Sequence, residues 1–156
     1  MRKLVLYSSI LILSVLLVLA CNKDNIETRP SVKIKSISPM QVPGNGDLQI
    51  NLTFTDKQGD LDSLFLKKIR TNKDQRPTQF DSINYQIPEF PEKSKGEIRI
   101  TIQYNFGLLS AINPASQVGA PNGKEPDTLI FKMYVKDKAK NASDTIFSDP
   151  VVVERQ

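Results

Sequence analysis

The stretch that decides the fold reads Leu48-Gln49-Ile50-Asn51-Leu52-Thr53-Phe54-Thr55. Apolar side chains occupy every second position, and polar side chains occupy the positions between them. Successive side chains of a β-strand point to opposite faces of a sheet, so this alternation predicts a strand with one buried face and one solvent-facing side. Clusters rich in Gly, Asp, Asn or Pro at 43–47 and 56–60 predict turns on both sides of it.

The same period of two recurs in both directions from this strand. We expect further strands at 32–38, 62–70, 83–87, 98–104, 129–136 and 143–154. The last of these should break or bulge at Asp149-Pro150, because proline cannot donate a hydrogen bond within a sheet. With no helical segment, seven short strands and their turns predict an all-β fold: a seven-stranded antiparallel β-sandwich of the immunoglobulin-like or fibronectin III-like type.

The N-terminus has the organisation of a secretory signal peptide. Two basic residues, Arg2 and Lys3, precede an almost wholly aliphatic run at 4–20 that ends in a small residue. A transmembrane helix is the alternative. A span needs roughly 20 apolar residues, whereas the run from 4 through 20 is 17 residues long, serines included, and charged residues follow within three positions. We therefore favour a signal peptide over a membrane span.

The end of this run, Val18-Leu19-Ala20-Cys21, resembles the lipobox of bacterial lipoproteins. The resemblance implies that the Cys21 thiol receives a diacylglycerol, that cleavage falls after Ala20, and that the new amine is acylated, with fatty acids such as palmitate. Cys21 is the one cysteine in the sequence, so it has no disulfide partner and lipidation accounts for it. Two or three acyl chains would hold the protein on a membrane.

Three other stretches resemble Bacteroidota lipoproteins. Asn22-Lys23-Asp24-Asn25 resembles their surface-export signal, and residues 54–61 and 135–143 resemble segments of their immunoglobulin-like domains. The resemblance implies attachment to the outer membrane and exposure at the cell surface, with the periplasmic face as the alternative. It implies no defined activity. The expected organisation is a signal peptide at 1–20, a lipidated tether at 21–31 and one β-sandwich at 32–156.

Composition narrows the function. The chain has no histidine and no tryptophan. The absence of histidine, and of a free thiol once Cys21 is lipidated, removes histidine-based acid–base catalysis, Ser-His-Asp and Cys-His nucleophiles, and His or Cys zinc sites. Without residues 1–20 the basic side chains fall from 21 to 19 against 17 acidic ones, a formal charge of +2. No basic patch with interleaved aromatic residues indicates a nucleic-acid partner.

We therefore predict a lipid-anchored cell-envelope protein that acts as a non-enzymatic binding or structural module toward an unidentified protein or glycan. One alternative is a glycan-capture accessory of an outer-membrane nutrient-uptake system. The lack of tryptophan speaks against it, and an exposed row of Tyr85, Phe90 and Tyr104 would favour it. Another alternative is a carboxylate-based hydrolase, which needs two acidic side chains in one cleft.

Alternating strand directions assign the loops to two ends of the sandwich. Loops 56–61, 88–96 and 137–141 should share the end at which the first strand begins, which is the membrane-facing end. Loops 71–81 and 106–126 should share the opposite end.

The first end carries a candidate calcium site made only of oxygen ligands. Its residues are Asp56, Asp60, Asp62, Asp137 and Asn141. Asp and Asn are also common in turns, where they accept hydrogen bonds from the backbone and tolerate positive φ. We favour this turn explanation, so that no cofactor is required, and keep Ca²⁺ as the alternative.

The long loop at the opposite end is unusually apolar. It contains Phe106, Leu108, Leu109, Ile112 and Val118, and loops of this length are often functional. We expect the first three to fold back and close the open end of the sandwich. Ile112 and Val118 are the candidate contacts for a partner.

A third pattern occurs four times: Asp, then a hydroxyl residue, then an aliphatic one. It resembles the O-glycosylation sequon of Bacteroidota exported proteins. The resemblance implies candidate glycan sites at Ser63, Ser82, Thr128 and Thr145. The alternative is that Asp-Ser or Asp-Thr before an aliphatic residue is simply how a turn enters a strand. The four copies in one chain favour modification of at least one.

Overall fold

A computed structural model describes residues 29–156 of the chain. Strands account for 48% of these residues and helices for 6%, so the fold is all-β. The strands are β1 (Ser31–Ser38), β2 (Gln41–Val42), β3 (Leu48–Thr55), β4 (Leu61–Arg70), β5 (Ser82–Gln86), β6 (Lys95–Ile102), β7 (Asp127–Asp137), β8 (Ile146–Phe147) and β9 (Val151–Val153). The predicted signal peptide, Cys21 and most of the tether lie outside this range.

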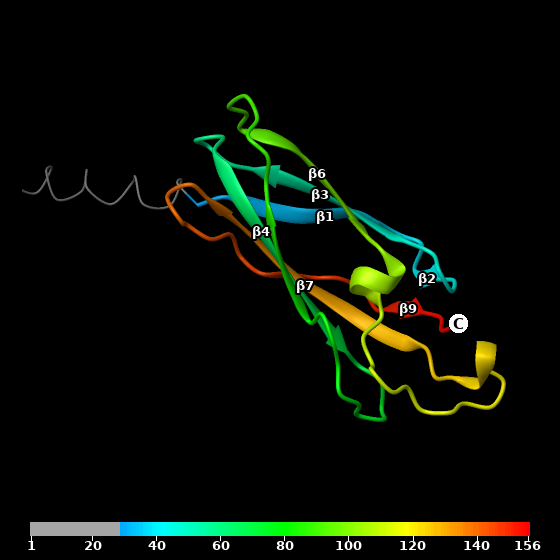
Figure 1. The fold of residues 1–156 in the computed structure, drawn as a ribbon. Coiled ribbons are helices and arrows are strands. Elements are labelled where there is room, and N and C mark those ends of the chain that lie inside the picture. Colours follow the sequence, from blue (N-terminus) through cyan, green and yellow to red (C-terminus); the bar gives the residue numbers. More distant parts are fainter. Residues whose placement is uncertain (1–28) are drawn as a thin grey trace, which may run out of the picture.

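The strands form two sheets that face each other (Figure 1). One sheet has the order β1-β3-β6, and all its pairings are antiparallel. The other has the order β2-β9-β7-β4-β5, with β8 paired to β7. As expected, the last predicted strand is divided at Asp149-Pro150, into β8 and β9.

The expectation of purely antiparallel sheets is wrong at one edge, because β2 and β9 are parallel. The first strand stops at Ser38, and Pro39 follows with no N–H to continue the pairing with β3. The chain then crosses to the second sheet. There Val152 N–H donates to the carbonyl of Met40, and Glu154 N–H donates to the carbonyl of Val42, both at 2.9 Å. A short parallel pair therefore closes this edge.

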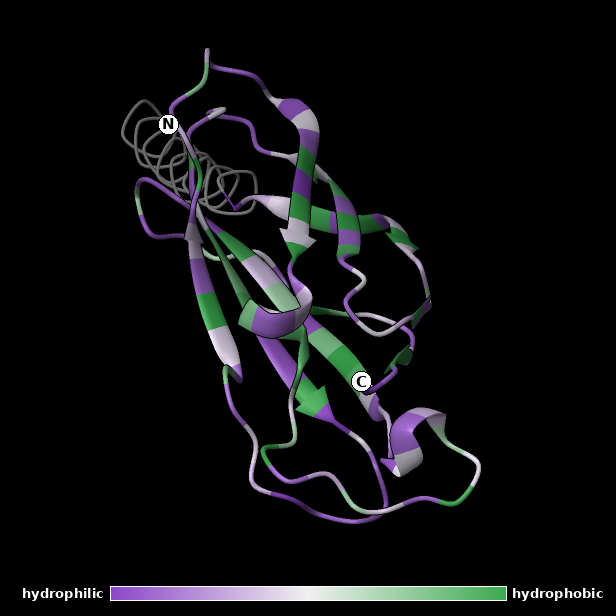
Figure 2. Cartoon of the chain, turned by 45° about the vertical axis from the view of Figure 1, so that its right-hand side comes forward, coloured by the Kyte–Doolittle hydropathy of each residue, from purple (hydrophilic) through white to green (hydrophobic). Residues whose placement is uncertain are grey.

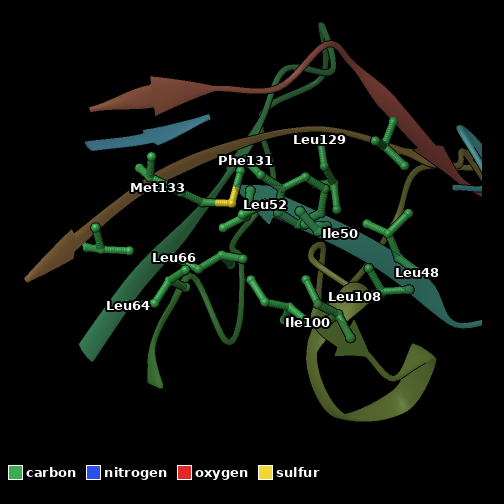
Figure 3. Close-up of a cluster of buried hydrophobic side chains, with 14 of the residues drawn as sticks. Leu48, Ile50, Leu52, Leu64, Leu66, Ile100, Leu108, Leu129, Phe131 and Met133 are labelled. Carbon is green, nitrogen blue, oxygen red and sulfur yellow. The ribbon is translucent and has the colours of Figure 1, made fainter. Parts of the chain in front are cut away.

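The core lies between the two sheets and is built from alternate residues of the long strands (Figure 3). In β3, Leu48, Ile50 and Leu52 are fully buried, while the residues between them face outward. In β7 the inward residues include Phe131 and Met133. Figure 2 shows the alternation as hydrophobic and hydrophilic bands along the strands. Each such side chain contributes about 1.5–3 kcal/mol on burial, which explains why the period of two decides the fold.

The loops 56–60, 87–94 and 138–145 lie together, and we call this the entry end. Ser31, the first residue of β1, pairs with Thr55 immediately before this end. Asp56 N–H donates to the carbonyl of Ser94 at 2.9 Å, which joins two of the loops. The grouping agrees with the expectation from strand direction.

The loops 71–81 and 103–126 lie together at the opposite end, which we call the far end. Gln79 N–H donates to the carbonyl of Ser110, and Ile112 N–H donates to the carbonyl of Pro77, both at 2.9 Å. Thr78 also forms an isolated antiparallel bridge with Ala111. Backbone hydrogen bonds therefore join the two loops.

The expectation of no helical segment is wrong within the long far-end loop. It contains a π-helical turn, η1 (Tyr104–Leu108), and a 3₁₀ turn, η2 (Pro121–Gly123). Gly107 allows the first turn to pack on β6, because a Cβ at this position would lie 2.7 Å from Ile102 Cγ2. Neither turn, nor any other helix within 29–156, has the length and apolar character needed to cross a membrane.

Candidate functional site

Two carboxylates meet at the entry end, that of buried Asp56 and that of half-buried Asp60. Asp56 follows β3 directly, and only 2% of its surface is exposed. Its Oδ2 accepts the backbone N–H of Asp60 at 2.9 Å. Its Oδ1 is buried and has no hydrogen-bond partner among residues 29–156, and the same is true of Asp60 Oδ1. We call these two residues the acid pair.

Burial raises the pKa of the Asp56 carboxyl, and the negative charge and side-chain contact of Asp60 act in the same direction. Hydrogen bonds from the backbone of Asp60 and Gln58 oppose the shift without cancelling it. In the folded protein, the site therefore favours the protonated, neutral form of Asp56 more than water does.

Gly59 explains how the loop brings the two carboxylates together. Its φ is +70°, in the left-handed region that glycine adopts without strain. Its N–H donates to the carbonyl of Asp56 at 3.2 Å, which closes the turn. A Cβ at this position would lie 2.6 Å from the backbone nitrogen of Lys93. Both the conformation and the close approach thus require glycine here.

The other three candidates for calcium coordination are engaged elsewhere. Asp62 Oδ2 accepts a hydrogen bond from Lys140 Nζ at 2.7 Å, and Oδ1 accepts one from Gln86. The Lys140 hydrogen bond lowers the pKa of Asp62 below its usual value. Asp137 accepts two hydrogen bonds from Asn141, one from the backbone N–H and one from the side chain, both at 2.7 Å.

The predicted five-residue shell is therefore not assembled in the structure. Asp137 and Asn141 close their own turn, as the alternative explanation from turn chemistry expected, and only the acid pair converges. Between residues 29 and 156, no group of three or more His, Cys, Asp or Glu side chains is placed to hold a metal ion.

Two hollows border the acid pair or lie near it. One, of about 130 Å³, is lined by Asp60, Asp62, Gln86, Glu89 and Lys138, among others. A second, of about 420 Å³, lies beside the β6 edge; its lining combines apolar residues such as Phe54, Phe90 and Ile98 with charged ones such as Glu97 and Arg99. Asp60 lines the first hollow and Asp56 does not, so the hollow borders the acid pair on the Asp60 side alone.

The far end holds a buried charge network that the sequence analysis missed. Asp127, the first residue of β7, is fully buried. Its Oδ1 accepts a hydrogen bond from Arg70 Nε at 2.8 Å, and its Oδ2 forms an ion pair with Arg155 Nη2. The backbone N–H groups of Ser110 and Ala111 also donate to this carboxylate. We call Arg70, Asp127 and Arg155 the charge network.

Lys68 is a further buried cation near this network, with 3% of its surface exposed. Its Nζ donates to the carbonyl of Leu109 at 2.9 Å. Burial lowers the pKa of Lys68 to about 8, although the carboxylates of Asp81 and Asp127 act against the shift. The hydrogen bond joins β4 to the far-end loop, and with the charge network it fixes the base of that loop.

Spacing could have revealed these residues. Lys68 follows Leu64 and Leu66 at intervals of two, so β4 places all three on the inner face. Asp127 precedes Leu129 on the inner face of β7 in the same way. A charged residue at an inward position of an alternating strand predicts a buried ion pair. The identity of its partner is not encoded locally.

The apolar residues of the far-end loop divide into two groups. Leu108 is fully buried, and Leu109 is partly buried against the core, so both close the end of the sandwich as expected. The same expectation is wrong for Phe106, which is 77% exposed because the π-helical turn directs it outward. Ile112 and Val118 are exposed, Val118 completely.

Exposed Phe80 lies in the neighbouring loop, with φ at +51°. The far end thus presents four large apolar side chains to solvent: Phe80, Phe106, Ile112 and Val118.

The four candidate glycosylation residues differ in access. Ser82 and Thr145 are exposed, Thr128 is half-buried, and Ser63 is buried within β4. In the folded domain, the first two therefore offer their hydroxyl groups to solvent most freely.

The three aromatic residues that would support glycan capture do not form an exposed row. Tyr104 is buried, and its hydroxyl donates to the carbonyl of Glu154 at 2.8 Å. Tyr85 is half-buried, and burial raises the pKa of its hydroxyl. Phe90 is half-buried and packs against Phe54, with 6.0 Å between ring centroids. No observation on these residues favours a sugar platform.

Comparisons with known proteins give distant structural likenesses alone. No known protein family matches the sequence, and no curated protein matches it. A superoxide reductase (neelaredoxin) from Ignicoccus hospitalis is similar with a TM-score of 0.43 and 11% identity, over 85% of this chain and 86% of that one. A β-glucosidase from Listeria innocua has a TM-score of 0.41 and 8% identity, over 81% of this chain and 16% of that one.

A Niemann-Pick type C2 protein from the Japanese carpenter ant has a TM-score of 0.37 and 12% identity, over 80% of this chain and 89% of that one. These three TM-scores are all below 0.5, so the likenesses carry no inference about activity, ligand or partner.

Proposed function

We propose that this chain is a lipid-anchored cell-envelope protein, attached to an outer membrane through Cys21, and that its β-sandwich is a non-enzymatic binding or structural module. Cys21 lies outside the described residues, so the support for the anchor comes from the lipobox resemblance of the sequence. The chain enters the sandwich at one end, and exposed apolar side chains lie at the opposite end. This arrangement supports the binding role and is the observation on which the proposal depends.

The chain enters the sandwich at one end and presents apolar side chains at the other. Arg29 Nε donates to the carbonyl of Ala142 at 3.0 Å, which ties the start of the described chain to the entry end (Figure 1). Ile112 and Val118 lie in the far-end loop and are exposed. An anchor that precedes Arg29 would therefore direct these side chains away from the membrane. Exposed apolar groups of this kind are suited to protein contacts.

The far-end loop is also held at its base, which favours recognition by a preformed surface. Asp127 accepts the N–H groups of Ser110 and Ala111, and Arg155 Nη2 donates to the carbonyl of Ala111 at 2.7 Å. A loop fixed in this way loses little conformational entropy when a partner binds.

We further propose that the sandwich belongs to the immunoglobulin-like class. β1, β3 and β6 correspond in order to strands A, B and E, and β4, β7 and β9 correspond to C, F and G. β5 pairs with β4, so the fourth strand extends the C-F-G sheet. An experimental structure in which β5 pairs with β6 would contradict this assignment.

The anchor is tested with Cys21→Ala in a bacterium that processes lipoproteins. We expect the wild-type protein to incorporate labelled palmitate and to remain with the membrane fraction. The variant should carry no label and keep its leader. Labelling of both proteins, or of neither, would contradict lipidation at Cys21.

The binding surface is tested by photo-crosslinking in intact cells. A crosslinking amino acid at position 118 should yield a discrete adduct. The same residue at position 147 serves as a matched control, since Phe147 is also exposed but lies on β8. Ile112→Asp should weaken the adduct from position 118. Equal adducts from both positions, or none at 118, would contradict a far-end binding surface.

We also propose O-glycosylation at Ser82 and Thr145, supported by the sequon resemblance and by the exposure of both residues. The intact mass of the native protein should exceed the mass of the processed lipoprotein by one or more glycans. Ser82→Ala and Thr145→Ala together should remove the excess. A native mass without glycan would contradict the proposal.

A further inference from the structure

The acid pair places the carboxylate of buried Asp56 against that of half-buried Asp60. Asp56 Oδ1 and Asp60 Oδ1 are both buried and lack a hydrogen-bond donor among residues 29–156. Buried polar atoms are nearly always satisfied by protein, water or an ion, and an unpaired buried carboxylate is more costly than a neutral group. The two carboxylates also contact each other, so one positive species between them would satisfy both oxygens.

Lys138 and Lys140, two cations of this end, pair with other carboxylates. Lys140 Nζ binds the carboxylate of Asp62 at 2.7 Å, and Lys138 Nζ lies 3.9 Å from Glu89. Neither ion pair involves the acid pair.

We propose that Asp56 and Asp60 bind one calcium ion through their Oδ1 atoms. The remaining positions of the shell would be filled by backbone carbonyls of the loop and by water from the hollow lined by Asp60. Calcium takes six to eight oxygen ligands in flexible geometry, whereas magnesium requires a small, nearly ideal octahedron. The donor set contains no nitrogen or sulfur, so it favours a hard cation over zinc or copper.

The charge of the site sets the expected strength of binding. Two carboxylates with neutral oxygens place it with the weak calcium sites of extracellular modules, at dissociation constants of about 10⁻⁴–10⁻³ M. Asp56 is joined to Ser94 through its backbone N–H. The ion would therefore stabilise both the β3–β4 turn and its attachment to the neighbouring loop.

The opposite view is that a single proton, shared between the carboxylates, satisfies the acid pair. An Asn at position 56 mimics this arrangement. Its amide oxygen can still accept the N–H of Asp60, and its amide N–H₂ can donate to Asp60 Oδ1 without any metal. Asp62→Asn is the matched control, because Asp62 is an acidic residue of the same end that pairs with Lys140.

The test uses the full chain in detergent, stripped of metal with a chelator and titrated with calcium chloride at pH 7.5. We expect wild-type Tm to rise by roughly 4 °C at 10 mM calcium, as linkage predicts for a millimolar site. Magnesium chloride at the same concentration should give less than half of this shift. Calorimetric titration of the wild type should give one site, which keeps the test independent of how well any variant folds.

The variants decide between the ion and the proton. Asp56→Asn and Asp60→Asn should lose the calcium shift, and Asp62→Asn should keep it. The proposal is overturned if wild type shows no shift and no calorimetric site. It is equally overturned if both acid-pair variants respond like the wild type, or if Asp62→Asn alone abolishes the response. A wild type that ignores calcium while Asp56→Asn has a higher Tm would assign a shared proton instead.

Discussion

Asp56 at the entry end and Asp127 at the far end occupy similar positions in the fold, but the groups around their carboxylates carry opposite charge. Each lies at the terminus of a long core strand, and each is almost completely buried. Asp127 is surrounded by donors: two guanidinium groups and two backbone N–H groups. Asp56 instead faces another carboxylate, and one of its oxygens has no partner among residues 29–156.

The difference teaches how one residue type can serve as a structural anchor or as a binding site. A buried carboxylate that is fully compensated fixes the segments around it, and here Asp127 fixes the base of the far-end loop. A buried carboxylate that is left uncompensated keeps an affinity for protons and cations. We therefore expect an Asp→Asn substitution to lower the free energy of unfolding at position 127 and to raise it at position 56.

The largest effect is expected from Asp127→Asn. Arg70 would keep its ion pair with Glu125 at 2.5 Å, but Arg155 would lose its ion pair with Asp127, and removing one partner of a buried ion pair typically costs about 3–5 kcal/mol. We expect the free energy of unfolding, measured with urea, to fall by this amount. Combining Asp127→Asn with Arg155→Met should restore part of the loss. A fall of less than about 1 kcal/mol would show that the network contributes little, and the contrast between the ends would disappear.

The second effect concerns pH and Lys68. Its pKa is lowered from 10.5 to about 8 in the folded protein. Between these values the folded state has released a proton that the unfolded state still holds, so stability rises with pH in this window. We expect a gain on the order of 2 kcal/mol between pH 8 and 10.5. Lys68→Met should flatten this part of the urea-unfolding profile, and an unchanged slope would contradict the assignment.

Asp56→Asn should act in the opposite sense to Asp127→Asn. In the absence of calcium the amide donates to Asp60 Oδ1 and removes one negative charge, so we expect a gain of about 1 kcal/mol. The raised pKa of Asp56 implies that wild-type stability decreases as pH rises from about 4 through that pKa. The variant should lack this decrease. A loss of stability in Asp56→Asn at pH 7 without calcium would show that the acid pair is not strained.

The smallest effect is expected at the exposed tips of the far-end loop. Ile112→Ser and Val118→Ser remove apolar groups that are already in water, so the free energy of unfolding should change by no more than about 0.5 kcal/mol. Leu108→Ser is the matched contrast, since Leu108 is fully buried in the same loop. Destabilisation of Val118→Ser comparable to that of Leu108→Ser would show that the loop tip is packed in solution.

The sequence predicted the long strands well and the candidate sites unevenly, and it missed the two-residue strand β2, so that residues 29–156 form nine strands where seven were expected. Leu48, Ile50 and Leu52 report their burial through their own spacing, so a local pattern was sufficient to place β3. Asp62 and Asp137 have the same residue type and turn setting as Asp56, yet they pair with Lys140 and Asn141. Turn composition cannot distinguish a carboxylate that caps its own loop from one that faces a second carboxylate.

Phe106 and Leu108 give a second instance of this limit. They lie two positions apart in one apolar stretch, and the structure exposes the first and buries the second. The separation follows from the π-helical turn around Gly107, which changes the side-chain directions that a strand or an extended loop would give.

The sequence by itself determined the all-β fold, the positions of the long strands and the grouping of the loops at two ends. These follow from a period of two and from turn residues, which act over a few neighbouring positions. The tertiary structure decided the parallel pairing of β2 with β9, the joining of Asp127 to Arg70 and Arg155 across 57 and 28 residues, and the unpartnered oxygens of the acid pair. The first two depend on groups that are distant in the chain, and the third depends on the absence of a hydrogen-bond donor. A local sequence pattern indicates neither.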